Sequence, residues 1–145
     1  QAFRARGGDV HVWGTRDSAK DYDGTEGSDL TGLCYARMDI ADFDTLNACV
    51  PPFAALDVLV LSQGTVIYRR GEFTMDGFRK VVDVNLNSLM ACALKFHDML
   101  AAAKGALITV SSTAGFHSTR GNPAYNASKT GAIGLTRTLG DAWQR

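Results

Sequence analysis

Two short, uninterrupted apolar runs constrain the fold of this chain more than any other feature. Residues 56–64, "LDVLVLSQG", and residues 106–112, "ALITVSS", are apolar without alternation and end in small polar residues. Runs of this kind are typical of strands that are covered on both faces, as in a parallel sheet. Two further β-rich stretches lie at 9–15 and 32–40. The sequence therefore predicts at least four strands.

Helical patterns separate these strands. We expect a helix over 41–50 with Asp42 near its start, one or two helices between Met75 and Gly105, and a last helix that Asn122 caps and Pro123 opens. The polar segment 17–31 is predicted to be a loop with a helical turn. Strands that alternate with helices predict an α/β fold of Rossmann type, a doubly wound parallel sheet with helices on both faces. We assign residues 1–145 to one domain.

Composition excludes several classes of function. Lysine and arginine number 15, and aspartate and glutamate number 15, so no charge excess indicates a nucleic acid or an anionic membrane as partner. The longest apolar runs are too short to span a bilayer. The cysteines Cys34, Cys49 and Cys92 lack CxxC spacing, which favours buried thiols in a reducing, cytoplasmic compartment. The three histidines are too scattered to indicate a metal site.

Three reactive side chains follow the last predicted strand. Ser112 ends that strand, Tyr125 falls in the first turn of the final helix, and Lys129 lies one turn later on the same face. A nearby ammonium and the positive end of the helix dipole both favour a phenolate, so we expect the pKa of Tyr125 to fall from about 10 toward the range of general acid–base catalysis. Ser112 is placed to donate a hydrogen bond to the substrate carbonyl oxygen that Tyr125 would protonate.

These residues resemble the short-chain dehydrogenase/reductase family, over essentially all 145 residues. The family's serine and Tyr-x-x-x-Lys are matched by Ser112 and by Tyr125 and Lys129 in "YNASK", and its asparagine by Asn85 in "VVDVNLNSL". The resemblance implies that Tyr125 exchanges the proton and that Ser112 polarises the substrate oxygen. Lys129 would lower the tyrosine pKa and bind the nicotinamide ribose. Asn85 would hold a water of the proton relay; on its own it would be read as a helix kink or a solvent-facing amide.

The cofactor positions of the family carry over less evenly. Its Asp-hydrophobic pair is matched by Asp39 and Ile40, although Asp39 serves equally well as a cap for the next helix. Its Asn-Asn-Ala-Gly is replaced by "LSQG" at 61–64, in which Gly64 still permits a close approach of the backbone to the cofactor. The predicted cofactor set is Thr15, Arg16, Asp39, Ile40, Leu61, Ser62, Gly64, Tyr125 and Lys129.

The end of the first strand bears on the choice of cofactor. Thr15 stands where an acid would accept bonds from the ribose of NAD, and Arg16 follows it. An arginine there can bind a 2′-phosphate through charge-assisted hydrogen bonds, which favours NADP(H) over NAD(H). The alternative is that Arg16 is an ordinary surface charge.

Both ends of the sequence interrupt a helical pattern, so we expect the domain to be incomplete at both ends. The family's glycine-rich turn would precede Gln1, on the order of 20–30 further residues. Its strand would lie between the strands that end near Thr15 and Leu61, because an empty centre would leave backbone groups unpaired. The final strands and the substrate lid would follow Arg145.

The sequence thus predicts an oxidoreductase that moves a hydride between NADP(H) and a carbonyl or secondary alcohol, similar to carbonyl and 3-oxoacyl reductases. It would work as a homotetramer or homodimer and use no metal, nucleic acid or membrane. Two alternatives stay open. One is a non-catalytic nucleotide-binding scaffold or sensor, and the other is a sugar-nucleotide epimerase or dehydratase that uses the same Tyr-Lys pair.

Overall fold

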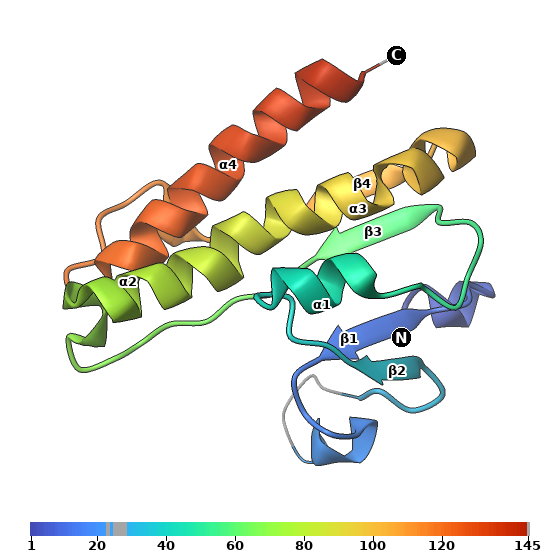
Figure 1. Ribbon diagram of the computed structural model, residues 1–145, viewed down its shortest axis with the longest axis horizontal. Helices are drawn as coiled ribbons and strands as arrows, with labels where there is room; N and C mark the ends of the chain where they lie inside the picture. The colour runs from blue at the N-terminus through green and yellow to red at the C-terminus, as the bar shows by residue number, and fades with distance from the viewer. Residues whose placement is uncertain (23, 25–28, 145) are drawn as a thin grey trace.

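The computed structural model describes residues 1–22, 24 and 29–144 (Figure 1). The strands are β1 (His11–Gly14), β2 (Cys34–Arg37), β3 (Val58–Leu61) and β4 (Ala106–Thr109). The helices are α1 (Phe43–Ala48), α2 (Met75–Val82), α3 (Ser88–Ala103) and α4 (Pro123–Trp143). A π-helical segment, Asp83–Asn87, joins α2 to α3, and short 3-10 turns lie at Arg4–Arg6, Ala19–Tyr22, Gly71–Phe73 and Thr113–Gly115.

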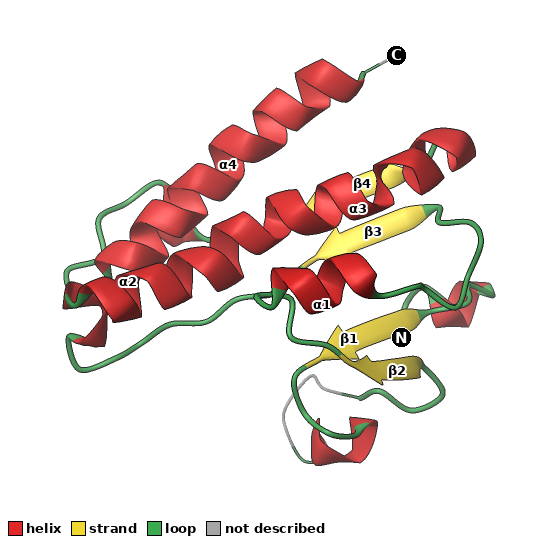
Figure 2. Ribbon diagram, viewed as in Figure 1, coloured by secondary structure: helices red, strands yellow, loops and turns green. Residues whose placement is uncertain are grey.

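The strands form two parallel pairs, β1 with β2 and β3 with β4. In Figure 2 the arrowheads of β1, β2 and β3 point the same way, so the carboxyl ends of the strands lie toward one side of the molecule. The parallel α/β fold predicted from the sequence is confirmed. Within the described residues β1 and β3 are not hydrogen-bonded to each other, and it is between these two strands that the sequence predicts a further one.

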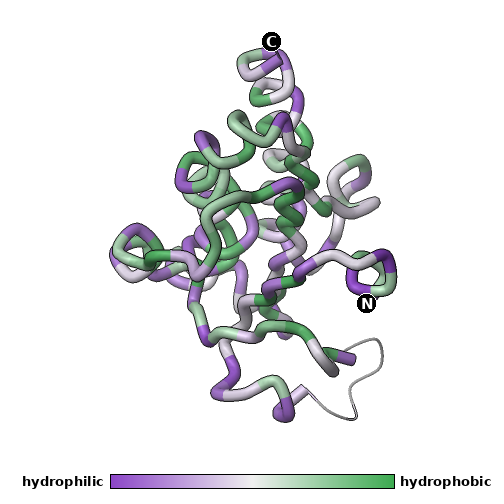
Figure 3. The backbone as a smooth tube through the Cα atoms, turned by 90° about the vertical axis from the view of Figure 1, so that its right-hand side faces the viewer, coloured by the Kyte–Doolittle hydropathy of each residue, from purple (hydrophilic) through white to green (hydrophobic). Residues whose placement is uncertain are grey.

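Helices α1 and α3 cover one face of the strands. The buried core contains Leu46 of α1, Leu61 of β3, and Leu89 and Cys92 of α3, together with Ala132 of α4. Figure 3 shows hydrophobic and hydrophilic stretches alternating along the backbone.

The opposite face of the β3–β4 pair is open. The paired residues Val60 and Ile108 are 42% and 43% exposed. The prediction that these strands are covered on both faces is therefore wrong for the described chain, because the helices that pack on this pair lie on the side of Leu59, Leu61 and Leu107.

Several predicted boundaries are confirmed. Asp42 caps α1, since its carboxylate accepts bonds from the main-chain N–H and the hydroxyl of Thr45 at 3.0 and 2.7 Å. Hydrogen bonds from Thr45 also hold the pKa of the Asp42 carboxyl below its ordinary value. The helical turn predicted within 17–31 is the 3-10 turn Ala19–Tyr22, and residues 23 and 25–28 of that predicted loop lie outside the described residues.

The long helix region between Met75 and Gly105 runs without interruption through α2, the π segment and α3. The start of α4 lies beside α2 at one end of the molecule (Figure 1). Among the described residues, no helix combines the length and apolar character needed to cross a membrane.

Candidate active site

The first turn of α4 is held by a residue distant in sequence. Pro123 occupies its first position, as predicted, but Asn122 makes no side-chain cap. Its amide nitrogen instead donates to the carbonyl of Ile67 at 3.3 Å and to Glu72 Oε1 at 3.2 Å. Glu72 Oε2 accepts the main-chain N–H of Tyr125 at 2.9 Å. The predicted Asn122 cap is wrong because a buried carboxylate takes its place.

Tyr125 and Lys129 lie one turn apart on α4, as their spacing predicts. The Lys129 ammonium is 5.8 Å from the centroid of the Tyr125 ring. It is buried, with 5% of the residue exposed, and donates to the carbonyl of Val110 at 3.0 Å, just beyond β4. The hydroxyl of Ser111 donates to the main-chain carbonyl of Lys129 at 2.8 Å. These two bonds fasten α4 to the end of β4.

Ser112 follows directly and is half-buried. Its Oγ accepts the main-chain N–H of Ala114 at 3.1 Å and so caps the 3-10 turn Thr113–Gly115. Because the oxygen is used as an acceptor, the hydroxyl hydrogen remains available to donate. The predicted proton transfer by Tyr125 requires such a hydrogen-bond donor to the substrate oxygen at this strand end.

Asn85 is fully buried within the π segment. Its Oδ1 accepts the N–H of Thr65 at 2.7 Å, and its Nδ2 donates to the carbonyl of Thr65 at 2.9 Å and to Ser128 Oγ at 3.1 Å. Ser128 in turn donates to the carbonyl of Tyr125 at 2.8 Å. A continuous chain of hydrogen bonds therefore runs from the loop after β3 through Asn85 to Tyr125.

Gly64 completes this cluster. A Cβ atom at Gly64 would lie 3.6 Å from Lys129 Nζ and 3.9 Å from Asn85 Oδ1. The structure thus brings together Gly64, Asn85 and Lys129. The neighbouring Gln63, which stands where the family has an alanine, donates to Ser88 Oγ of α3 at 2.9 Å.

The other predicted cofactor positions lie at the strand ends and differ in what they contact. Ser62 and Thr15 are exposed. Leu61 is buried in the core, and Ile40 packs against it. Asp39 is exposed and accepts the N–H of Ala41 at 3.0 Å, a local turn rather than the cap of α1.

Arg16 is exposed, and its neighbours orient it. The guanidinium carbon lies 4.4 Å from the centroid of the Tyr22 ring, and the group donates to the carbonyl of Asp21. Tyr22 can pack against the end of β1 because residue 14 is a glycine. A Cβ atom at Gly14 would collide with the Tyr22 hydroxyl. The arginine is therefore held beside the end of β1.

Another group of potential ligands lies at the amino ends of β1 and β2. Side-chain atoms of Asp9, His11 and Cys34 all lie within 4.8 Å of one another, and Asp9 pairs with His11 at 3.1 Å. The predicted burial of the thiols holds for Cys92 and is wrong for Cys34, which is exposed on β2; Cys49 is half-buried. Cys34 is exposed because no described helix covers this part of β2.

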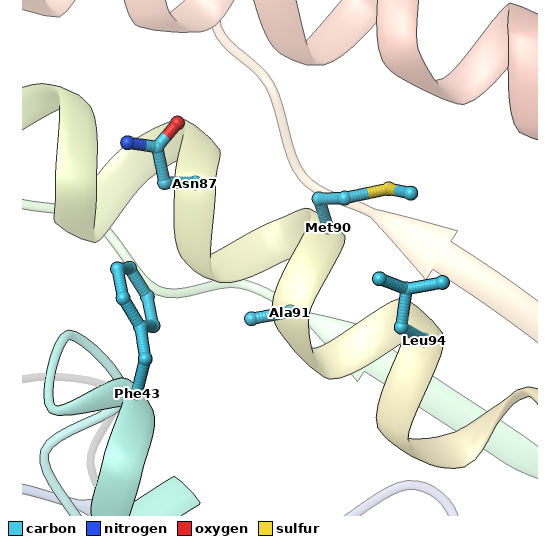
Figure 4. A pocket seen from close by; sticks show the side chains of 5 residues that line it. All are labelled: Phe43, Asn87, Met90, Ala91 and Leu94. Atoms are coloured by element: carbon cyan, nitrogen blue, oxygen red, sulfur yellow. The ribbon is translucent and has the colours of Figure 1, made fainter. Parts of the chain in front are cut away.

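A shallow hollow of about 340 Å³ lies between α1 and α3 (Figure 4). Its lining residues are Phe43, Asn87, Met90, Ala91 and Leu94. None of the predicted catalytic residues lines it. It is a surface feature of α3, separate from the Tyr125 cluster.

A sequence model of the short chain dehydrogenase family matches residues 17–145. The chain belongs to the short-chain dehydrogenase family. The resemblance noted from its motifs is confirmed, and the match covers all four predicted catalytic positions and most of the predicted cofactor positions.

Relatives of this short-chain dehydrogenase include the 3-oxoacyl-[acyl-carrier-protein] reductase FabG of Chlamydia muridarum, 30% identical over 148 residues, which cover 94% of this chain and 58% of the relative. The 2-dehydro-3-deoxy-L-rhamnonate dehydrogenase (NAD(+)) of a Sphingomonas species is 31% identical over 143 residues, which cover 94% and 56%. The chain thus spans a little over half the length of these relatives.

Solved structures share the fold of this short-chain dehydrogenase. The ligand-free aldohexose dehydrogenase of Thermoplasma acidophilum superposes with a TM-score of 0.83 at 19% identity, covering 99% of this chain and 55% of that one. ElxO with NADP bound gives a TM-score of 0.80 at 18% identity, covering 98% and 60%. At these identities the likeness concerns the fold alone.

Three residues of the site were missed by sequence reasoning. Glu72, Ser128 and Gln63 were not among the predicted site residues, and each has a hydrogen-bond partner that lies 25 to 53 positions away. Ser128 had one available signal, since it lies between Tyr125 and Lys129 in "YNASK" and follows Tyr125 by three positions.

Proposed function

We propose that this short-chain dehydrogenase transfers a hydride between NADP(H) and a carbonyl or secondary alcohol, with Tyr125 as general acid–base. The observation that carries the proposal is the buried Lys129 ammonium 5.8 Å from the Tyr125 ring, next to Gly64 and Asn85. A positive charge at this place stabilises negative charge that develops on the phenol oxygen. The family membership of the chain supports the same assignment.

Each residue of the cluster has a proposed task. The nicotinamide, when bound, supplies or accepts the hydride. The Ser112 hydroxyl, free to donate, binds the substrate oxygen and aligns it. Tyr125 gives a proton to that oxygen during reduction and takes it back during oxidation. Lys129 keeps a positive charge beside the phenol.

Asn85 has a proposed task that is narrower than the resemblance implies. Both of its amide hydrogens are directed at protein acceptors, Thr65 O and Ser128 Oγ. We therefore assign it first to fixing the loop after β3 and the first turn of α4. A water of the proton relay would be held by oxygen atoms of the π segment, and not by the N–H groups of Asn85.

The residues fit a nicotinamide dinucleotide. Gly64 is exposed and lacks the side chain that would stand between the backbone and the Lys129 ammonium. Arg16 presents an exposed guanidinium beside the end of β1, which supports NADP(H) because guanidinium binds a 2′-phosphate through charge-assisted bonds. Among the remaining predicted positions, Asp39 and Ile40 would contact the adenine ring. Leu61 would contribute to cofactor binding through its position next to Ser62.

The substrate proposed is a small carbonyl compound with an apolar part. Phe116, 70% exposed, lies four residues beyond Ser112 and provides an apolar contact. Relatives that reduce 3-oxoacyl groups make a 3-oxoacyl thioester a fitting first compound. We further propose a cytoplasmic homo-oligomer that packs through α3, where Leu94 is 58% exposed beside the hollow of Figure 4.

The test is the consumption of NADPH, followed by absorbance, over a panel of carbonyl compounds that includes a 3-oxoacyl thioester. Tyr125→Phe is expected to lower kcat by on the order of 10²–10⁴. Tyr68→Phe is the control, because Tyr68 is 72% exposed and belongs to the loop before α2. Equal turnover by Tyr125→Phe and the parent would show the assignment to be wrong, and binding of NADPH without any turnover would indicate a scaffold.

A further inference from the structure

Glu72 is a buried acid outside the predicted catalytic set. It lies in the 3-10 turn Gly71–Phe73, just before α2, and only 1% of it is exposed. Oε1 accepts the N–H of Ile67 at 3.1 Å and the side-chain amide of Asn122 at 3.2 Å. Oε2 accepts the N–H of Tyr125 at 2.9 Å. Within the described residues, no lysine, arginine or histidine pairs with it.

Burying a carboxylate is costly unless its oxygens are hydrogen-bonded. Here three N–H groups and the amino end of α4 compensate for the lost water. The first N–H groups of a helix have no partner within the helix, and that of Tyr125 is one of them. A negative charge at this end also complements the helix dipole. Glu72 therefore caps α4 from a position 53 residues earlier in the chain.

The three donors belong to two segments of the candidate site, the loop after β3 and the start of α4. Ile67 lies in the loop after β3, two residues beyond the Thr65 that Asn85 holds. Asn122 precedes α4, and its amide also donates to the Ile67 carbonyl. Tyr125 carries the phenol itself. Glu72 thus ties the loop that follows Gly64 to the backbone of the proposed acid–base residue.

We propose that Glu72 is a positioning residue for Tyr125. Its carboxylate fixes the main chain of Tyr125 relative to the loop 65–67, and thereby places the phenol beside the substrate oxygen. Glu72 acts through Tyr125 and not on the substrate. The proposal rests on the proposed function of Tyr125.

Glu72→Gln tests the need for a carboxylate at nearly constant size. A glutamine has one acceptor oxygen, so its amide nitrogen must face at least one of the three N–H donors. We expect kcat to fall about tenfold, because a small misplacement of a reacting group is costly to the rate. We expect the Kd for NADPH to stay within about twofold, since Glu72 makes no proposed cofactor contact. Asp76→Asn is the matched control, an exposed acid four residues away.

A double variant separates positioning from general stabilisation. If Glu72 acts through Tyr125, then Glu72→Gln lowers the rate of the parent but not the residual rate of Tyr125→Phe. A further loss of the same size in the Tyr125→Phe background would overturn the proposal. Parental kcat in a folded Glu72→Gln would overturn it as well.

A second variant covers the case in which Glu72→Gln does not fold, as judged by circular dichroism. Asn122→Ala removes one donor from the carboxylate and leaves Glu72 in place. It is expected to lower kcat less than Glu72→Gln does, again only when Tyr125 is present; unchanged kcat would count against the proposal. A failure of the proposed function has a different signature, because Tyr125→Phe would then match the parent whatever occupies position 72.

Discussion

The side-chain amide of Asn85 holds the main chain of Thr65 by both of its polar groups, at 2.7 and 2.9 Å. A residue of the π segment thus fixes the loop that follows β3. The same amide reaches Ser128 of α4, so one side chain joins three segments that the candidate site needs together. π-helical segments of this kind are often found at functional sites, and here the segment places the amide where these bonds meet.

Replacing Asn85 by alanine should therefore destabilise the protein. The N–H and carbonyl of Thr65 would lose their partners in a partly buried environment, so we expect the free energy of unfolding to fall by about 1–3 kcal/mol. Urea titration measures the loss. Asn87→Ala in the same π segment is the control, because Asn87 is exposed and its side chain, among the described residues, bonds only to Asp83. Equal stability of the two variants would show that the Thr65 contacts do not hold the loop.

Gly64→Ala should separate folding from cofactor binding. The new methyl group would lie 3.6 Å from Lys129 Nζ and 3.9 Å from Asn85 Oδ1, which are ordinary contact distances. We expect the free energy of unfolding to change by less than about 0.5 kcal/mol. The methyl group would stand where the dinucleotide approaches Lys129, so we expect the Kd for NADPH to rise about tenfold, equivalent to about 1.4 kcal/mol.

Gly134→Ala is the control for that substitution. A Cβ at this position of α4 would meet open space. Alanine should stabilise the helix by about 0.5–1 kcal/mol and leave the Kd unchanged. Fluorescence titration with NADPH gives both constants. An unaltered Kd in Gly64→Ala would remove Gly64 from the cofactor site.

What the sequence could predict here was mostly local. The spacing of Tyr125 and Lys129 determines their relation through helix geometry alone, and the Asp42 carboxylate caps α1 by accepting the N–H of Thr45, three residues away. The alternation of apolar runs with helical patterns extended this to the fold, because strands that alternate with helices predict a parallel α/β sheet.

What the sequence could not predict depended on tertiary contacts. Asn122 has the right chemistry for a cap, but the carboxylate of Glu72 takes the N–H of Tyr125 from 53 positions upstream. No local pattern marks such a partner. Likewise, the apolar character of Val60 predicts burial, yet its exposure depends on which face the helices cover.

Arg16→Ala should change the preference for NADPH over NADH. The guanidinium is exposed and held against the Tyr22 ring, ready for a 2′-phosphate that only NADPH carries. Hydrogen bonds to charged groups contribute about 1.5–3 kcal/mol, so the Kd for NADPH should rise at least about tenfold while that for NADH stays the same. The difference should shrink at high salt, because exposed charges are screened.

Arg37→Ala controls for the loss of a positive charge near the same sheet edge. Arg37 ends β2 and pairs with Asp17 at 2.6 Å. Calorimetry with each dinucleotide should show no change in preference for this variant. If Arg16→Ala and Arg37→Ala weaken NADPH binding equally, the effect is one of overall charge, and Arg16 does not bind the 2′-phosphate.

The cysteines should differ sharply in reactivity. Cys34 is exposed on β2, whereas Cys92 is buried in the core, where burial raises the pKa of its thiol to about 11. The thiolate is the reactive form. Iodoacetamide at about pH 8.5, near the ordinary thiol pKa, should therefore alkylate Cys34 in the folded protein and Cys92 only after unfolding in urea. Peptide mass spectrometry distinguishes the two sites.

The same burial makes stability depend on pH. Between the ordinary thiol pKa of about 8.5 and about 11, the unfolded chain releases a proton that folded Cys92 retains. The Cys92 contribution to the free energy of unfolding should thus be complete below this range and fall as pH rises, by at most about 1.4 kcal/mol per unit. Cys92→Ala should show a shallower decline than the parent, and Cys34→Ala the parental decline. Equal slopes in all three proteins, or alkylation of Cys92 in the folded state, would mean that the core around α3 admits water.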